Sequence, residues 1–138
     1  MTVFRTSRRI EFRDTDMAGI AHFSVFFVMM EQIEHEFLRS RGLSVHETDE
    51  EGIISWPRVS ARCDYRSAVR FEDVVEVELR ISRMGEKSVT YAYVFSHGGH
   101  TVAEGEITAV CCRMHGHDRP ESIAIPKDIR ERLQAVGG

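Results

Sequence analysis

One segment of the sequence has the apolar repeat of a long helix, and it limits what the rest of the chain can form. Between residues 24 and 41, apolar side chains recur at three- and four-residue spacing, which is the pattern of an amphipathic helix. The apolar positions are Phe26, Met29, Met30, Ile33, Phe37 and Leu38, and the polar side holds Glu31, Gln32, Glu34, His35 and Glu36. Ser24 can cap the first turn with its hydroxyl, and Gly42 can end the helix in a left-handed conformation. We predict one long helix from Ser24 to Arg41.

The remaining apolar residues mostly alternate with polar ones, which is typical of half-buried strands. A first strand is predicted from Thr2 to Phe12, and further alternating runs follow Pro57. These later strands are predicted at residues 59–65, 75–81 and 89–95 and from the turn at 97–100 to about Met114. Tight turns join the last three strands, so we expect an antiparallel meander.

Two other segments have no strand pattern. The region from Val45 to Gly52 is polar and acidic without periodicity, and we predict a loop there. Near the end of the chain, Ile125, Ile129, Leu133 and Val136 follow a helical spacing around Pro126. A short terminal helix is therefore predicted.

The order of these elements predicts an α+β fold in one domain that spans residues 1–138. A chain of this length can bury one core. The order is one strand, the long helix and four more strands, which gives an antiparallel sheet of about five strands around one central helix. Such a sheet leaves edges and one face exposed, and a second copy of the chain could cover them.

Composition excludes some classes of protein. With a formal net charge of -4, the surface has no general attraction for nucleic acid. The N-terminus lacks the apolar run of a signal peptide, and no segment is long enough for a membrane span. The three cysteines are odd in number and suggest no disulfide framework. We therefore expect a cytoplasmic protein that binds neither nucleic acid nor membrane.

The stretch RDTDMAGIAHF, residues 13–23, lies between the first strand and the long helix. It places Asp14, Asp16 and His22 around a turn that contains Gly19. Acids and glycine are common in turns, so a solvated turn is the simplest interpretation of this stretch alone.

Several motifs together resemble a known family. Asp14-Thr15-Asp16-Met17-Ala18-Gly19-Ile20 before a helix, then Pro57-Arg58-Val59 leading into Cys63-Asp64-Tyr65, and then residues 68–77 resemble the hotdog-fold acyl-CoA thioesterases of the 4-hydroxybenzoyl-CoA thioesterase type. The resemblance extends from Arg8 to about Met114. It implies the hotdog fold, in which an antiparallel sheet wraps around one long central helix.

The resemblance also implies roles for residues of the turn. Asp16 matches the catalytic carboxylate of the family, and Asp14 matches its companion acid. The backbone N–H of Phe23 would stabilise the oxyanion at the helix N-terminus, and Gly19 would let the turn pass close to the substrate. An aspartate could attack the thioester carbonyl itself or take a proton from an attacking water. The sequence leaves both mechanisms open.

Three positions bear on the substrate. His22 departs from many relatives. It is a candidate catalytic residue that could hydrogen-bond the substrate or water, or it could simply order the turn, and a supporting role is favoured over direct catalysis. Val25 stands where close relatives often have asparagine. Phosphates of coenzyme A favour cationic side chains. Lys87 is the candidate at the turn that carries a basic cluster in the benzoyl-type relative, and Arg58 is another cation close by in sequence.

The leading hypothesis is an acyl-CoA thioesterase that hydrolyses its substrate to free acid and CoA. The family likeness implies a homodimer or homotetramer with sites between protomers, and no metal or redox cofactor is expected. Residues 115–118, HGHD, form no recognisable zinc pattern and are interpreted as a solvated loop. A non-catalytic acyl-CoA or acyl-carrier binding protein is the alternative, and a hotdog dehydratase is less favoured.

Overall fold

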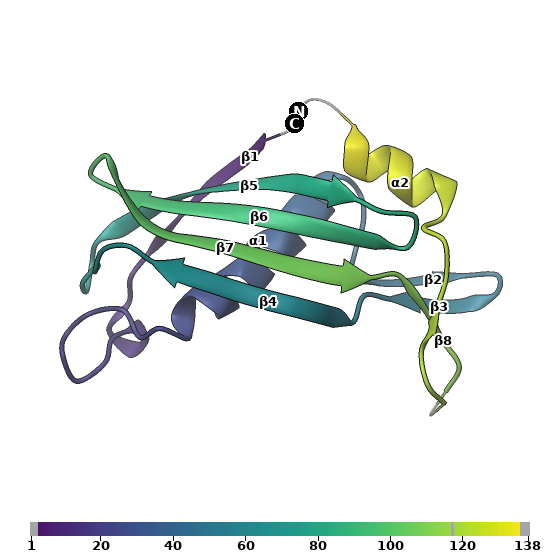
Figure 1. Cartoon of the computed structure of the whole chain (residues 1–138), viewed down its shortest axis with the longest axis horizontal. Helices are drawn as coiled ribbons and strands as arrows, with labels where there is room; N and C mark the ends of the chain where they lie inside the picture. The colour runs from purple at the N-terminus through teal and green to yellow at the C-terminus, as the bar shows by residue number, and fades with distance from the viewer. Residues whose placement is uncertain (1–2, 117, 136–138) are drawn as a thin grey trace.

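A curved five-stranded antiparallel sheet packs on one long helix (Figure 1). The computed structural model describes residues 3–116 and 118–135. The sheet has the order β1-β5-β6-β7-β4. Its strands are β1 (Val3–Arg9), β4 (Arg58–Tyr65), β5 (Val74–Met84), β6 (Ser88–His97) and β7 (His100–Val110). The helix is α1 (Val25–Ser40). The predicted α+β class, the five strands and the central helix are confirmed.

The core lies between the inner face of the sheet and α1. All six apolar positions predicted for the helix are buried, and they meet side chains of β5, β6 and β7. Phe26 contacts the edge of Phe95 at a centroid distance of 5.3 Å. A side chain at Gly105 of β7 would overlap the sulfur of Met30. The bare backbone at this position therefore lets α1 approach the sheet closely.

The two ends of α1 differ in how well the sequence predicted them. Gly42 has a φ of +71°, and its N–H donates to the Arg39 carbonyl at 3.0 Å, so the left-handed stop is confirmed. At the start, Ser24 makes no side-chain cap. Its hydroxyl contacts Nδ1 of His22 at 2.7 Å instead, so the predicted cap is wrong.

A second, smaller sheet was missed from the sequence. Its order is β2-β3-β8-β9, with β2 (His46–Asp49), β3 (Gly52–Ser55), β8 (Cys112–Met114) and β9 (Glu121–Ser122). The predicted loop at residues 45–52 is wrong, because β2 and β3 form a hairpin there. Mostly exposed strands need no apolar alternation, so their sequence resembles a loop. The buried Arg113 holds this hairpin through ion pairs with Asp49 and Glu51.

Three smaller differences concern element ends. The first strand was predicted to reach Phe12, but it ends at Arg9. Phe12–Asp14 instead form a single 3-10 turn, η1, in which Phe12 is 76% exposed. The predicted last strand is interrupted at Cys111, where the chain passes from β7 to β8. The terminal helix is confirmed as α2 (Lys127–Gln134). Thr2 and Val136, which were included in predicted elements, lie outside the described residues.

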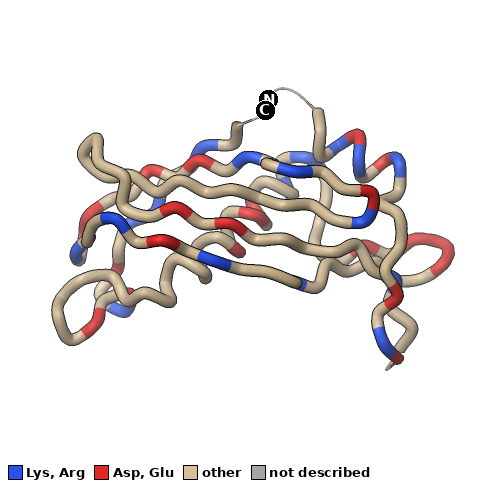
Figure 2. The backbone as a smooth tube through the Cα atoms, viewed as in Figure 1, with Lys and Arg blue, Asp and Glu red and all other residues tan. Residues whose placement is uncertain are grey.

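Charged residues of both signs are interspersed along the strands of the large sheet (Figure 2). Arg5 pairs with Glu78 at 3.0 Å, and Arg62 of β4 pairs with Glu106 of β7 at 3.4 Å. Among the described residues, no helix is both long and apolar enough to cross a membrane.

Candidate active site

The turn after η1 fixes the carboxylate of Asp16. The Gly19 N–H donates to the Asp16 carbonyl at 2.9 Å, and Gly19 has a φ of +79°, which favours glycine. Oδ1 of Asp16 accepts hydrogen bonds from the backbone N–H groups of Ala18 at 2.8 Å and Ile20 at 3.4 Å. Oδ2 makes no hydrogen bond with any residue that the structure describes. One carboxylate oxygen is therefore held by the backbone, and the other is open.

Asp16 lies on the wall of a pocket of about 330 Å³ between the turn, the start of α1 and the end of β4. Its lining consists of Asp16, Ile20, Ala21, Phe23, Phe26, Tyr65, Arg66, Ser67, Ala68 and Val69. Most of these side chains are apolar. An apolar pocket with a few polar groups is the usual form of a small-molecule site.

The backbone just before α1 has an unpaired donor within the described chain. The His22 carbonyl accepts the Val25 N–H at 3.0 Å, but the Phe23 N–H has no acceptor among the described residues. It lies at the positive end of the helix dipole. Asp16 and Phe23, both predicted site residues, line the same pocket.

His22 is fixed by its neighbours in the same segment. Its backbone N–H donates to the Asp14 backbone carbonyl at 2.8 Å. Nδ1 accepts the Ser24 N–H at 3.2 Å and lies 2.7 Å from the Ser24 hydroxyl oxygen, within hydrogen-bond distance. The imidazole stacks on the Phe23 ring with centroids 4.6 Å apart. His22 is not part of the pocket lining, and its contacts order the turn.

The side chain of Asp14 lies in a different cavity from that of Asp16. Its Oδ2 accepts the Glu11 N–H at 2.8 Å and closes η1. Asp14 lines a cavity of about 500 Å³ together with Arg8, Arg13 and the outer side of α1. The predicted pairing of the two acids at one site is therefore not seen, although the Asp14 backbone supports His22.

The two predicted CoA-binding cations are Arg58, at the start of β4, and Lys87, in the β5–β6 turn. Figure 1 shows both of these segments at the end of the sheet opposite the end of β4. Tyr65, at the pocket, is the last residue of β4 and Arg58 is the first, a separation of about 23 Å along a strand. Lys87 lies in the β5–β6 turn at that far end, and its carbonyl accepts the Cys111 N–H at 2.7 Å. Neither cation meets Asp16 in the single chain.

Arg58 forms an ion pair with Glu34, a buried acid of α1. Glu34 is 1% exposed. Its two carboxylate oxygens accept hydrogen bonds from the two terminal nitrogens of Arg58, and the distance from Nη1 to Oε2 is 2.9 Å. Burial raises the pKa of Glu34, and the guanidinium opposes this shift. The sequence pattern placed Glu34 on the polar side of the helix, and this is wrong, because the residue is buried. The pattern could not show this, since the charge that pairs with Glu34 comes from Arg58 of β4, which is distant in sequence.

Sequence reasoning missed Arg66, Ser67 and Val69 of the pocket. They follow β4 and reach the Asp16 turn because the Ala21 N–H donates to the Val69 carbonyl at 2.8 Å. Tyr65, the last residue of β4, also lines the pocket. A long-range pairing between two loops brings these residues together, and no local sequence pattern encodes it.

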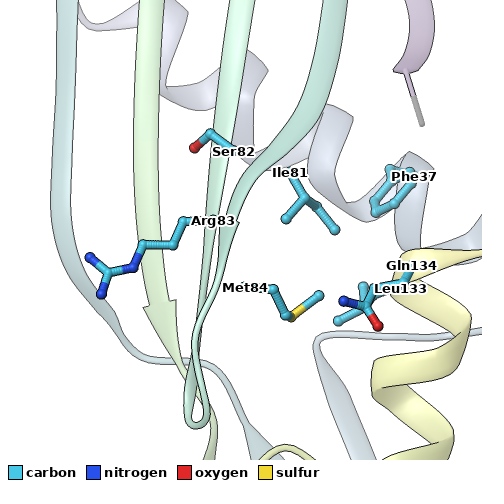
Figure 3. A pocket seen from close by; sticks show the side chains of 7 residues that line it. All are labelled: Phe37, Ile81, Ser82, Arg83, Met84, Leu133 and Gln134. Atoms are coloured by element: carbon cyan, nitrogen blue, oxygen red, sulfur yellow. The ribbon is translucent and has the colours of Figure 1, made fainter. Parts of the chain in front are cut away.

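Other parts of the described chain offer less chemistry. A second cavity of about 230 Å³ lies between α1, β5 and α2. In Figure 3, Phe37, Ile81, Met84 and Leu133 surround it, while Arg83 points away. It holds no acid or histidine. Residues 3–116 and 118–135 contain no cluster of three or more potential metal ligands, and His117 of the HGHD segment lies outside the described residues.

Comparisons with known proteins agree on the kind of protein. Residues 10–133 match the family model described as "Thioesterase-like superfamily". A protein of Aquifex aeolicus proposed to be an esterase is 30% identical, with 92% of this chain and 94% of that protein covered. A 1,4-dihydroxy-2-naphthoyl-CoA hydrolase of Synechococcus elongatus is 24% identical, with 97% of each covered. A solved structure of a gentisyl-coenzyme A thioesterase has a TM-score of 0.79 at 25% identity and covers 94% of this chain and 99% of that one.

Proposed function

The chain belongs to the thioesterase-like superfamily and has its hotdog fold, and on that basis we propose that it hydrolyses an acyl-CoA thioester to the free acid and CoA. The observations that carry the proposal are the pocket that Asp16 and Phe23 both line and the Phe23 N–H, which has no acceptor among the described residues. A carboxylate and a backbone donor on one apolar pocket are the groups that thioester cleavage needs. Relatives named as hydrolases of aromatic CoA thioesters support this substrate class.

Asp16 supplies the carboxylate for the first step. Either Oδ2 bonds to the carbonyl carbon and CoA leaves as thiolate, giving an anhydride that water cleaves, or Oδ2 takes a proton from a water whose oxygen attacks that carbon. Both routes end with the acid, the thiol and a regenerated carboxylate. Neither route requires a metal or a redox cofactor.

The helix start stabilises the charge that develops on the substrate. When the carbonyl carbon becomes tetrahedral, its oxygen carries negative charge. The Phe23 N–H has no competing acceptor in the described part of the chain, so it can donate to that oxygen. Gly19 keeps the turn in its left-handed conformation and so sets the position of Asp16.

We also propose that the working form is a homodimer, or a homotetramer of two such dimers. The edge strand β4 exposes Val59 at 62% and Tyr65 at 46%, and a second copy would cover these apolar side chains. Antiparallel pairing of two β4 strands would bring the Lys87 end of one copy to the pocket of the other. Lys87 remains the proposed contact for CoA phosphates, whereas Arg58 is engaged by Glu34.

The test is thiol release from aromatic, short-chain and long-chain acyl-CoAs by wild type, Asp16→Asn and Asp16→Ala. We expect turnover of one class by the wild type and its loss in both variants at unchanged melting temperature. Glu78→Gln is the matched control, because this carboxylate lies on β5, away from the β4 edge, is 47% exposed and pairs with Arg5 of β1. It should retain activity.

Three outcomes would overturn the assignment. Activity that survives both Asp16 changes removes Asp16 as the catalyst. Tight binding of acyl-CoA without thiol release indicates the non-catalytic binding protein. Hydration of an enoyl-CoA indicates the dehydratase.

A further inference from the structure

Three hydrogen bonds hold the backbone around Phe23, and the Phe23 N–H is left without an acceptor among the described residues. The His22 carbonyl accepts the Val25 N–H at 3.0 Å, and the Ser24 N–H donates to Nδ1 of His22 at 3.2 Å. The Phe23 carbonyl accepts the hydroxyl of Tyr65 at 2.8 Å. The Phe23 N–H shares a planar peptide unit with the His22 carbonyl, and the Phe23 carbonyl shares the next unit with the Ser24 N–H. With both units held, rotation about the two Phe23 Cα bonds that join them is restrained, and this sets the direction of the Phe23 N–H.

Of these bonds, the one from Tyr65 connects the helix start to the sheet. The others join residues 22–25 to one another, whereas Tyr65 is 42 positions away in sequence. Helix ends fray when only local bonds hold them. The Tyr65 bond therefore ties the donor to the rigid end of β4.

Packing fixes the position of the Tyr65 hydroxyl. Its ring meets Phe26 edge to face at 5.6 Å, and Phe26 in turn meets Phe95 of β6 at 5.3 Å. Partial burial and the neighbouring Cys63 raise the pKa of Tyr65. The hydroxyl consequently stays protonated and donates at neutral pH.

We propose that Tyr65 is a positioning residue for catalysis: its hydroxyl holds the Phe23 carbonyl and thereby aims the Phe23 N–H at the thioester oxygen. The inference rests on the proposed thioesterase function. It adds a residue that acts through Phe23 and has no need to touch the reacting atoms. An oxyanion donor must lie within hydrogen-bond distance of the developing charge, so a small loss of alignment lowers the rate.

The test compares Tyr65→Phe with Tyr93→Phe in kinetics on the acyl-CoA that the wild type prefers. Tyr65→Phe removes only the hydroxyl and keeps the ring contact with Phe26. We expect kcat to fall about tenfold, with KM within about twofold and the melting temperature unchanged. Tyr93→Phe is the matched control, because this buried hydroxyl has no hydrogen-bond partner among the described residues, and it should leave kcat unchanged.

A second readout does not depend on turnover. In amide spectra of the ¹⁵N-labelled protein, Tyr65→Phe should shift the Ser24 resonance, since that amide shares a peptide unit with the Phe23 carbonyl, and should also shift the Phe23 resonance. It should speed hydrogen exchange at Val25, whose N–H bonds the His22 carbonyl of the peptide unit that carries the Phe23 N–H. Tyr93→Phe should change none of these. If the wild type hydrolyses no thioester, the proposed function fails, but the spectra still decide whether Tyr65 holds Phe23.

Other results would overturn the inference. A rise in KM at constant kcat would make Tyr65 a substrate contact, and unchanged kinetics would leave it without a role. Unmoved Ser24 and Phe23 amides would show that the bond does not position the donor. Equal losses of kcat in both variants would show a general effect of removing a hydroxyl from the sheet.

Discussion

Two acids beside the same helix have opposite surroundings. Asp16 precedes α1, is partly exposed, and has one oxygen held by backbone N–H groups and the other open. Glu34 lies in the middle of α1, is 1% exposed, and has both oxygens engaged by Arg58. An open oxygen at a pocket can react, whereas a fully paired buried carboxylate can only hold other groups in place. The difference separates an acid suited to chemistry from one suited to structure.

Replacing each acid by its amide gives the largest expected contrast. Asp16→Asn should lower kcat/KM by at least about a hundredfold without lowering the melting temperature, because its backbone bonds can be kept by the amide oxygen. Glu34→Gln should leave kcat nearly unchanged and lower the melting temperature. Steady-state kinetics and thermal unfolding of both variants measure this, and a reversed pattern would exchange the two roles.

Replacing Arg58 tests whether the buried Glu34 carboxylate depends on its ion pair. Arg58→Met leaves Glu34 buried without its partner, and we expect the free energy of unfolding to fall by about 3 kcal/mol. Adding Glu34→Leu to Arg58→Met removes the isolated charge and should restore most of the loss. Urea unfolding of the single and double variants checks this. A double variant no more stable than the single one would contradict the assigned pairing.

The pH dependence of stability should differ in sign between two acids of α1. Burial raises the pKa of Glu34 above 4.5, so its contribution is present below that value and is lost as pH rises through the raised pKa. Burial alone would also raise the pKa of Glu36, but hydrogen bonds from Arg8 and Thr6 lower it below 4.5. Its contribution is present above 4.5 and is lost as pH falls through the lowered pKa.

The measurement is the melting temperature of Glu34→Gln and Glu36→Gln relative to wild type between acidic and neutral pH. The deficit of Glu34→Gln should shrink as pH rises, and that of Glu36→Gln should grow. Equal slopes would show that the two carboxylates are not shifted in opposite directions.

The smallest expected effect concerns the start of the helix beside Asp16. Ser24 makes no side-chain cap, so Ser24→Ala should cost less than about 0.5 kcal/mol, compared with about 1 kcal/mol for a serine that caps a helix. Chemical denaturation of the variant measures the difference. A cost near the usual value for a cap would mean that the hydroxyl bonds the first turn and leaves His22 free.

Local patterns in the sequence predicted most of the large sheet and the helix. The apolar repeat located α1 to within a residue at each end, since the spacing itself determines which side is buried. The same repeat placed Glu34 on the polar side, because the charge that stabilises it comes from Arg58 of β4. The hairpin of β2 and β3 was missed because its mostly exposed strands show no apolar alternation, and the pairing of β3 with β8 was missed because it joins residues distant in sequence.

In the candidate site, too, residues close together in sequence were predicted better than residues that long-range pairing brings together. Asp16 and Phe23 belong to one short segment, and the structure places both at one pocket. Asp14, two residues earlier, lines another cavity because η1 turns its carboxylate toward the Glu11 N–H. The positions of Lys87 and Arg58 depend on which end of the sheet each strand reaches, and the sequence does not specify that.

The small sheet has a consequence for the order in which the chain folds. Its β3 pairs Ile53 with Met114, and all of β4, β5, β6 and β7 lies between these two residues. The hairpins β5–β6 and β6–β7 close short loops, whereas β3–β8 closes a long one and has a larger entropic cost. The small sheet should therefore form late, after the meander has brought Cys111 beside Lys87, and Asp49, Glu51 and Arg113 should contribute little to the folding transition state.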